Sequence, residues 1–128
     1  KGFLFARRRK ETAEIAAVDC GSIYGDKYTV GRDAVTGIGN NVILDFGEFD
    51  LTDFVPARIV ITGRTKLAFN SIQAAFEGTE KRTVLCDFAK ADDYTERAFP
   101  LEGISGKVKI SLIFLPGCDF DIRSFRLE

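Results

Sequence analysis

The chain has 128 residues, of which 45% are hydrophobic, a length and composition that suit one domain with a single core. Its 18 Lys and Arg residues against 19 Asp and Glu residues give a net charge of −1, which lacks the basic excess typical of nucleic-acid-binding domains. Histidine is absent, so histidine bases, Ser–His and Cys–His nucleophile pairs and histidine metal ligands are excluded. No apolar run approaches the roughly 20 residues of a membrane span. We expect neither nucleic acid nor a membrane among the partners.

The three cysteines, Cys20, Cys86 and Cys118, lie too far apart in the sequence for a CxxC zinc or redox motif, and we interpret them as buried thiols. Their odd number is typical of a reducing compartment, so a cytoplasmic location is predicted. The sequence starts at Lys1 and contains no Met, and we expect it to be a single domain, residues 1–128, cut from a longer protein.

Taken in chain order, the sequence predicts a series of short β-strands. The segment 11–18 is the one candidate for a helix, but its alanines and β-branched residues form no apolar stripe, so a strand is predicted there instead. The polar segment 63–71 separates two strands, and the basic run 7–10 is interpreted as a solvated turn. The predicted strands span residues 3–5, 15–18, 28–30, 42–46, 57–62, 72–76, 84–88, 97–101, 107–114 and 120–127.

Strand periodicity is clearest in 107–114, where apolar residues alternate with lysines and a serine. In 120–127 the apolar residues change face partway along, which predicts a β-bulge near Arg123 and Ser124. The twelve phenylalanines mostly occupy periodic positions and are predicted to lie in the core. Many short strands separated by turn residues are typical of an all-β sandwich or barrel.

A set of motifs in a fixed order extends over nearly the whole chain. It resembles a module at the C-terminal end of bacterial family-two glycoside hydrolases, the β-galactosidase-like enzymes, and is more distantly similar to family-six carbohydrate-binding modules. The resemblance implies a two-sheet antiparallel jelly-roll β-sandwich, galactose-binding-domain-like, with sugar bound by loops at one end or along an edge. The motifs are Ser22-Ile-Tyr-Gly-Asp26, Asp33-Ala-Val-Thr-Gly-Ile-Gly-Asn-Asn-Val42, Phe46-Gly-Glu-Phe-Asp50, Ile61-Thr-Gly-Arg64, residues 94–101, and 108–117 followed by Phe120-Asp-Ile-Arg-Ser-Phe125.

In the wider binding-module family two aromatic rings sandwich a sugar, and a polar residue near the last strand bonds to it. The first aromatic position falls on Gly37 here, the second on Tyr94, and the polar position near Asp119 or Asp121. We therefore take Tyr94, Asn40, Asn41 and Asp119 as the candidate carbohydrate-binding residues, because aromatic faces and amide or carboxylate groups suit sugars. For Tyr94 the alternative is half-buried packing, and for the two asparagines it is a turn.

The resemblance also implies calcium as the usual structural ion, held by oxygens near the joined terminal strands. Glu14, Asp19 and Asp121 are the candidate ligands. Arg123 stands where the wider family tends to carry an acid, and its charge would repel a metal ion. We therefore expect no cofactor, with calcium as the alternative.

Three functions follow as hypotheses. The first is a noncatalytic module that binds carbohydrate weakly and accompanies the catalytic domain of its parent chain, a β-galactosidase-like glycoside hydrolase. The second is a purely structural module that packs on the parent enzyme without a ligand. An independent enzyme is the third, and it is disfavoured because adjacent carboxylates such as Asp92 and Asp93 point to opposite faces of a strand.

Overall fold

The computed structural model describes residues 14–128, so the strand predicted at 3–5 and the basic run at 7–10 lie outside the described residues. Within that range the chain is almost entirely β-structure, and all paired strands are antiparallel. The elements are β1 (Ile15–Ala16), the 3₁₀ turn η1 (Ala17–Asp19), β2 (Ser22–Tyr24), β3 (Thr29–Val30), β4 (Val35–Ile38), β5 (Val42–Leu51), β6 (Arg58–Glu77), β7 (Lys81–Pro100), β8 (Gly106–Phe114) and β9 (Phe120–Leu127).

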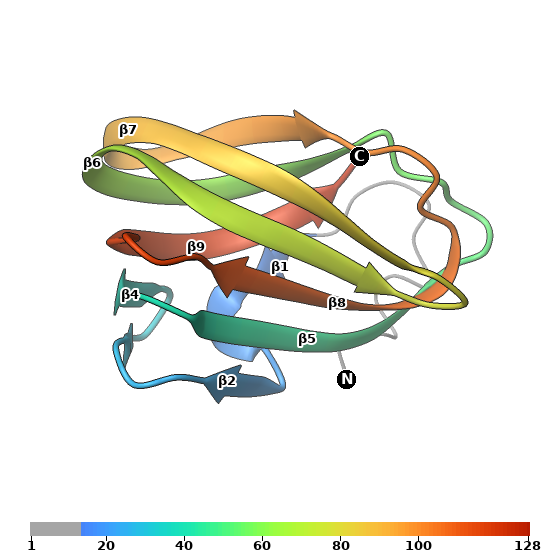
Figure 1. Cartoon of the computed structure of the whole chain (residues 1–128), viewed down its shortest axis with the longest axis horizontal. Helices are drawn as coiled ribbons and strands as arrows, with labels where there is room; N and C mark the ends of the chain where they lie inside the picture. Colours follow the sequence, from blue (N-terminus) through green and yellow to red (C-terminus); the bar gives the residue numbers. More distant parts are fainter. Residues whose placement is uncertain (1–13) are drawn as a thin grey trace.

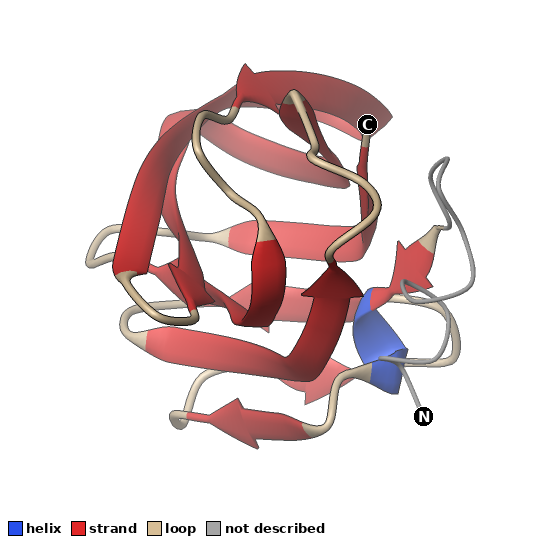
Figure 2. Ribbon diagram, turned by 90° about the vertical axis from the view of Figure 1, so that its right-hand side faces the viewer, coloured by secondary structure: helices blue, strands red, loops and turns tan. Residues whose placement is uncertain are grey.

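Hydrogen bonding joins the strands into one continuous sheet, which curls until its two halves face each other (Figures 1 and 2). In the first layer the order is β2, β5, β8 and the second half of β6. In the second layer it is β3, β4, β9 and the first half of β6, with β1 beside β9. The β7 strand follows β6 through both layers, and β6 is its sole partner among the described strands. The predicted two-layer antiparallel sandwich is confirmed.

The long strands β6 and β7 correct the prediction of four shorter ones. The segment 63–71 was expected to be a connection because it is polar, and 97–101 was expected to be separate from 84–88. The two segments of β6 form one strand, and so do the two segments of β7. Residues of β6 on each side of the polar stretch pair with residues of β7, for example Gly63 with Thr95 and Ser71 with Asp87. The hairpin bends between these pairs and thereby passes from one layer to the other (Figure 1).

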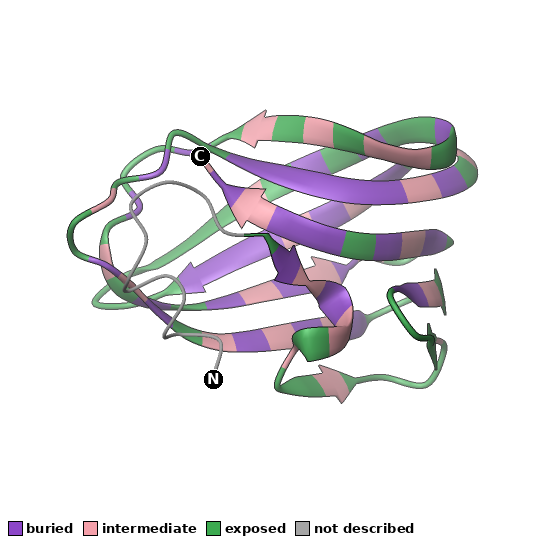
Figure 3. Cartoon of the chain, turned by 180° about the vertical axis from the view of Figure 1, so that it is seen from behind, coloured by how far each residue is buried: buried purple, intermediate pink, exposed green. Residues whose placement is uncertain are grey.

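The core between the layers contains two clusters of phenylalanine rings. Phe120 on β9 meets the ring of Phe88 edge-on, with centroids 4.8 Å apart, and lies 5.8 Å from Phe114 on the opposite layer. Phe125 meets Phe46 in the same edge-on manner at 4.8 Å. Such contacts between layers fix the layers against each other through large apolar surfaces. Figure 3 shows the buried positions alternating with more exposed ones along the strands.

The predicted bulge in β9 is confirmed. Thr62 pairs with Ser124 and Gly63 pairs with Ile122, which leaves Arg123 as an extra residue on β9. The bulge moves the apolar side chains after it back to the core, so Phe125 is fully buried, as Phe120 and Ile122 are before it.

Two other predictions need correction. The predicted strand 15–18 is a strand only at Ile15–Ala16, after which the chain makes the 3₁₀ turn η1. Phe69 is 61% exposed rather than in the core, because it lies in the bend of β6, where the alternation of faces is interrupted. None of the helical structure found in residues 14–128 is long and apolar enough to cross a membrane.

We predict that Gly63→Ala destabilises the domain by about 2 kcal/mol, because a methyl group there would overlap the Phe120 ring and the backbone oxygen of Asp121. A Cβ at Gly63 would lie 2.3 Å from the ring and 2.8 Å from that oxygen. Urea unfolding monitored by circular dichroism measures the change.

Gly21→Ala is the matched control, because the nearest atom to its added Cβ is 3.6 Å away. The free energy of unfolding of this variant should stay within about 0.5 kcal/mol of the parent value. Equal stability of the two variants would mean that close packing at Gly63 contributes nothing.

Candidate functional site

The candidate site lies where the β6–β7 hairpin bends, at one end of the sandwich. Gly63 pairs with Thr95 and Thr65 pairs with Ala91, so residues 92–94 of β7 stand opposite Arg64 alone. Past Thr65 the extra residues are on β6, since Phe69 pairs with Ala89. These two irregularities bend the hairpin and turn side chains outward at the rim.

A buried polar network joins this bend to the loop before β9. The Thr65 hydroxyl donates to the backbone oxygen of Asp119 at 2.8 Å and accepts from the Asn70 amide at 2.7 Å. The Asn70 side-chain oxygen in turn accepts from the backbone N–H of Asp119 at 2.8 Å. Both Thr65 and Asn70 are buried, so these bonds satisfy polar groups that would otherwise destabilise the core. The network fixes the backbone of Asp119 and leaves its side chain exposed.

Asp121 links three strands at the same rim. Its carboxylate accepts from the Gly37 N–H of β4 at 2.9 Å and from Nε of Arg64 of β6 at 2.8 Å. The hydrogen bond to Asp121 raises the pKa of the Arg64 guanidinium. Gly37 has φ of +60°, and no heavy atom lies within 4 Å of where its Cβ would be. Space beside Asp121 is therefore open at Gly37, the position where the resemblance places a first aromatic residue.

Two guanidinium groups lie over the ring of Tyr94. Cζ of Arg123 is 4.1 Å from the ring centroid, and Cζ of Arg64 is 4.6 Å from it. The bulge in β9 supplies Arg123, and the bulge in β7 supplies Tyr94. Partial burial raises the pKa of the Tyr94 phenol, and the nearby charge of Arg64 only partly opposes this rise. The phenol is therefore protonated at neutral pH.

A hollow of about 400 Å³ opens beside this cluster. It contains both positive and negative groups, which together can donate to and accept from the hydroxyls of a polar ligand. Its lining residues are Arg64, Thr65, Lys66, Ala91, Asp92, Asp119 and Asp121.

The structure brings together two of the four predicted sugar-binding residues. Asp119 lines the hollow, and Tyr94 touches its wall through Arg64. Asn40 and Asn41 line a separate hollow with Cys118 and do not line this one.

Both asparagines serve turns. The Asn40 side-chain oxygen accepts from the backbone N–H of Gly117 at 2.7 Å, and Asn41 has φ of +61°. A short amide side chain tolerates that left-handed conformation. The geometry of both asparagines is therefore that of turn residues, which was the alternative to sugar binding.

The three candidate calcium ligands are not grouped. Glu14 accepts a hydrogen bond from Ser124 at 2.5 Å and pairs with Arg126 at 3.4 Å, whereas Asp121 pairs with Arg64. The cation beside Glu14 is thus Arg126 rather than Arg123, which lies on Tyr94. Over residues 14–128 no three Asp, Glu or Cys side chains are placed to hold one metal ion.

Sequence reasoning missed several residues that build the site. Arg64 was seen only as part of a motif, and nothing in the local pattern shows that it meets Tyr94 and Asp121. Thr65 and Asn70 looked like ordinary polar residues of a connection. The signal available was the polar stretch itself, because buried hydrogen-bonding residues inside a strand often mark a bend.

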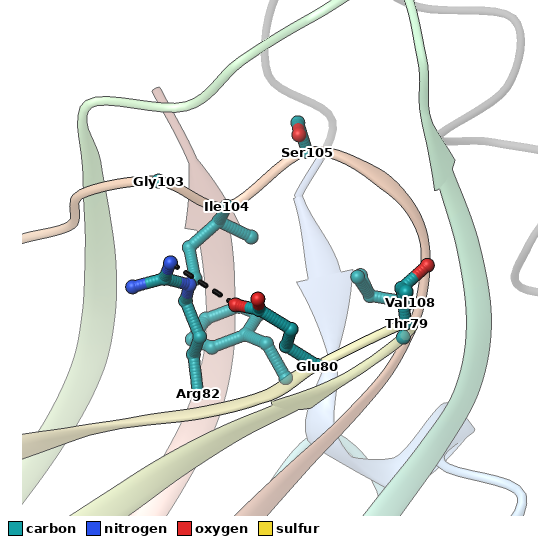
Figure 4. Close-up of a pocket in the computed structure, with 9 residues that line it drawn as sticks. Thr79, Glu80, Arg82, Gly103, Ile104, Ser105 and Val108 are labelled. Atoms are coloured by element: carbon teal, nitrogen blue, oxygen red, sulfur yellow. Dashed lines mark hydrogen bonds and ion pairs between the residues drawn. The ribbon is translucent and has the colours of Figure 1, made fainter.

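Another hollow, of about 310 Å³, lies at the turn between β6 and β7, which in Figure 1 is at the opposite end of the sandwich from the bend. Figure 4 shows the residues that line it. There the charged groups of Arg82 and Glu80 pair with each other at 3.2 Å. Its aromatic residue, Phe76, is buried and offers no exposed ring. Because this hollow offers no exposed aromatic ring, we take the rim at Tyr94 as the candidate site.

The cysteine thiols are not activated as nucleophiles. All three cysteines are free, and burial raises the pKa of Cys86 to about 12. Burial also raises the pKa values of Cys20 and Cys118. Cys86 and Cys118 are buried as predicted, whereas Cys20 is only half-buried.

No protein-family model matches the sequence, and no curated protein matches it. Solved structures do. The module CsCBM6-3 from Clostridium stercorarium in complex with cellobiose has a TM-score of 0.78 and 17% identity, covering 91% of this chain and 92% of that one. A family 6 carbohydrate-binding module from Clostridium cellulolyticum in complex with xylose has a TM-score of 0.76 and 18% identity, covering 91% and 96%.

A third similar structure is a glycoside hydrolase family 43 arabinoxylan arabinofuranohydrolase from Bacillus subtilis in complex with cellotetraose. Its TM-score is 0.71 at 15% identity, and the match covers 90% of this chain but 26% of that one. At these identities the likeness establishes the β-sandwich fold, and function has to be argued from the site.

We predict that calcium leaves the domain's stability unchanged, because Arg126 occupies the carboxylate of Glu14. The melting temperature should agree within about 1 °C in EDTA and in millimolar CaCl₂, measured by scanning calorimetry. An ion bound at 100 times its Kd would add about 2.7 kcal/mol, which is several degrees for a domain of this size. A rise of that size would restore the calcium site.

We also predict that native protein at pH 8 reacts with a thiol reagent fastest at Cys20 and not measurably at Cys86 within an hour. Thiolate is the reactive form, and a pKa of about 12 leaves almost none of it at Cys86. Mass mapping of the labelled cysteines, with denatured protein as control, checks the order.

The raised pKa of Cys86 also makes stability depend on pH. Because burial favours the neutral thiol, the contribution of Cys86 to the free energy of unfolding is present below pH 9 and is lost as the pH rises toward 12. Fast native labelling of Cys86 would contradict the buried placement.

Proposed function

We propose that the chain is a noncatalytic carbohydrate-binding module whose sugar site is the hollow at the bend of β6 and β7. The observation that carries the proposal is the convergence of Arg64, Asp119 and Asp121 beside the partly exposed ring of Tyr94. Structural neighbours with this fold bind cellobiose and xylose, which supports the same class of ligand here.

The chemistry of the rim suits a sugar. Sugar hydroxyls donate to carboxylates such as Asp119 and accept from guanidinium and ammonium groups, and the C–H face of the ring packs on an aromatic side chain. The two guanidinium groups over Tyr94 restrict access to its faces, and Gly37 supplies no second ring. Binding is therefore weak, with a Kd of about 1 mM or poorer, which corresponds to about 4 kcal/mol.

The partner within the parent protein is a catalytic domain of the family-two, β-galactosidase-like glycoside hydrolases. Support comes from the ordered motifs that resemble the C-terminal module of those enzymes, and from a neighbour in which the matching module is about a quarter of a larger glycoside hydrolase. The module itself contributes no catalysis. Its adjacent acids, Asp92 and Asp93, are both exposed at the bulge, and its thiols are held protonated by burial.

A purely structural module is the second candidate. The same observations that weaken sugar binding favour it, namely the glycine at position 37 and the coverage of Tyr94 by Arg64 and Arg123. A ligand titration separates the two functions.

We predict that galacto-, gluco- or xylo-oligosaccharides at tens of millimolar shift amide resonances at residues 64–66, 91–94 and 119–121 in heteronuclear NMR spectra. Tyr94→Ala should abolish these shifts, because it removes the aromatic surface, and should leave the fold intact, because the ring is partly exposed.

Tyr24→Ala is the control, because it removes a ring with 55% exposure outside the hollow, and this variant should bind as the parent chain does. Absence of shifts with every sugar would favour the structural module. Shifts that cluster on the loops 78–80 and 101–105 would move the site to the opposite end.

A further inference from the structure

We propose, on the basis of the carbohydrate-binding function above, that the rim at Tyr94 selects an acidic saccharide with a single carboxylate, such as a uronic acid joined to a neutral sugar. The carboxylate would bind to the guanidinium of Arg123 at the ring of Tyr94, where the guanidinium of Arg64 also lies.

Arg123 supplies an uncompensated positive charge at the rim. Its side chain is exposed, and within residues 14–128 no carboxylate lies within the 4.0 Å of an ion pair with it. Its guanidinium is positioned by the ring of Tyr94 instead. A planar guanidinium with free N–H groups binds a carboxylate through two parallel hydrogen bonds, which an ammonium cannot do.

Arg64 brings a second guanidinium to the same ring without cancelling the first charge. Its Nε bonds to Asp121, so this pair is neutral as a unit, and its side chain remains 43% exposed. The terminal N–H groups of Arg64 have no partner in the described part of the chain. One carboxylate therefore matches one unpaired guanidinium, with additional donors available from Arg64.

The backbone leaves room for the ligand at this point. Gly37 has open space where a side chain would project, and its N–H is fixed on Asp121. Because Asp121 also holds Arg64, this open space lies on the side of Asp121 that faces β4, next to the Asp121–Arg64 pair.

The acids of the hollow limit the ligand to one carboxylate. Asp92 and Asp119 line the hollow, and neither forms an ion pair in the described structure. The one ammonium that lines the hollow, that of Lys66, is outnumbered by these two acids. A second carboxylate reaching into the hollow would therefore face a net negative charge, which disfavours it, whereas sugar hydroxyls can donate to the acids. A single uronate followed by a neutral sugar satisfies both parts of the site.

The test compares a disaccharide of glucuronic acid and a neutral hexose with its uncharged methyl ester, using NMR titration of the full chain. The Kd of the acid should be about tenfold lower than that of the ester. Hydrogen bonds to a charged group contribute more free energy than neutral ones, by an amount that corresponds to about tenfold in Kd. Arg123→Gln should remove the difference. Arg82→Gln, the same change at the opposite end, should keep it.

The other outcomes of these titrations distinguish failure of carboxylate selection from failure of sugar binding. Equal binding of acid and ester would overturn selection for a carboxylate while leaving the proposed sugar binding intact. No binding of the acid, the ester or neutral oligosaccharides would overturn the proposed function itself. Acetate at equal concentration should not reproduce the shifts, and if it does, the site binds anions rather than sugars. Tighter binding of a diuronate than of the single uronate would overturn the limit to one carboxylate.

Discussion

One long hairpin that serves both layers is the constraint on which the structure depends. Strands β6 and β7 pair with each other along most of their length, while the two halves of β6 pair with β9 and with β8. A regular hairpin of this length would continue in one layer, so the residues at its middle have to depart from the regular register. The bulges on β7 and β6 are that departure. The fold thus requires irregular backbone at one end of the sandwich, and irregular backbone turns polar side chains outward.

The polar groups at the bend also form hydrogen bonds that hold the backbone of the site in place. Thr65 and Asn70 bind the backbone of Asp119 from within the core. Asp121 binds β4 and β6 from β9. The backbone of Asp119 and Asp121 is therefore held by β6 at this rim, which lowers the entropy lost when a ligand binds.

Much of the fold could be predicted from the sequence because strand periodicity is local. The alternation in 107–114 and the change of face in 120–127 identified β8, β9 and the bulge at Arg123. The continuity of β6 could not be predicted, because the polar stretch 63–71 owes its pairing to distant residues of β7. The candidate site could be anticipated only where motifs or a resemblance pointed to it. A resemblance placed Tyr94 and Asp119 near it, but the contacts of Arg64 depend on tertiary structure.

The β7 strand has a further consequence for how the molecule behaves among its copies. One side of its backbone pairs with β6, and the other side forms an open edge in the described structure. A long straight edge of this kind could pair with another chain and start aggregation. The bulge at residues 92–94 bends the edge in the middle, exposed Lys81 and Lys90 add charge, and Pro100 ends it without an N–H. The same bend that shapes the rim therefore also protects the protein from edge-to-edge association.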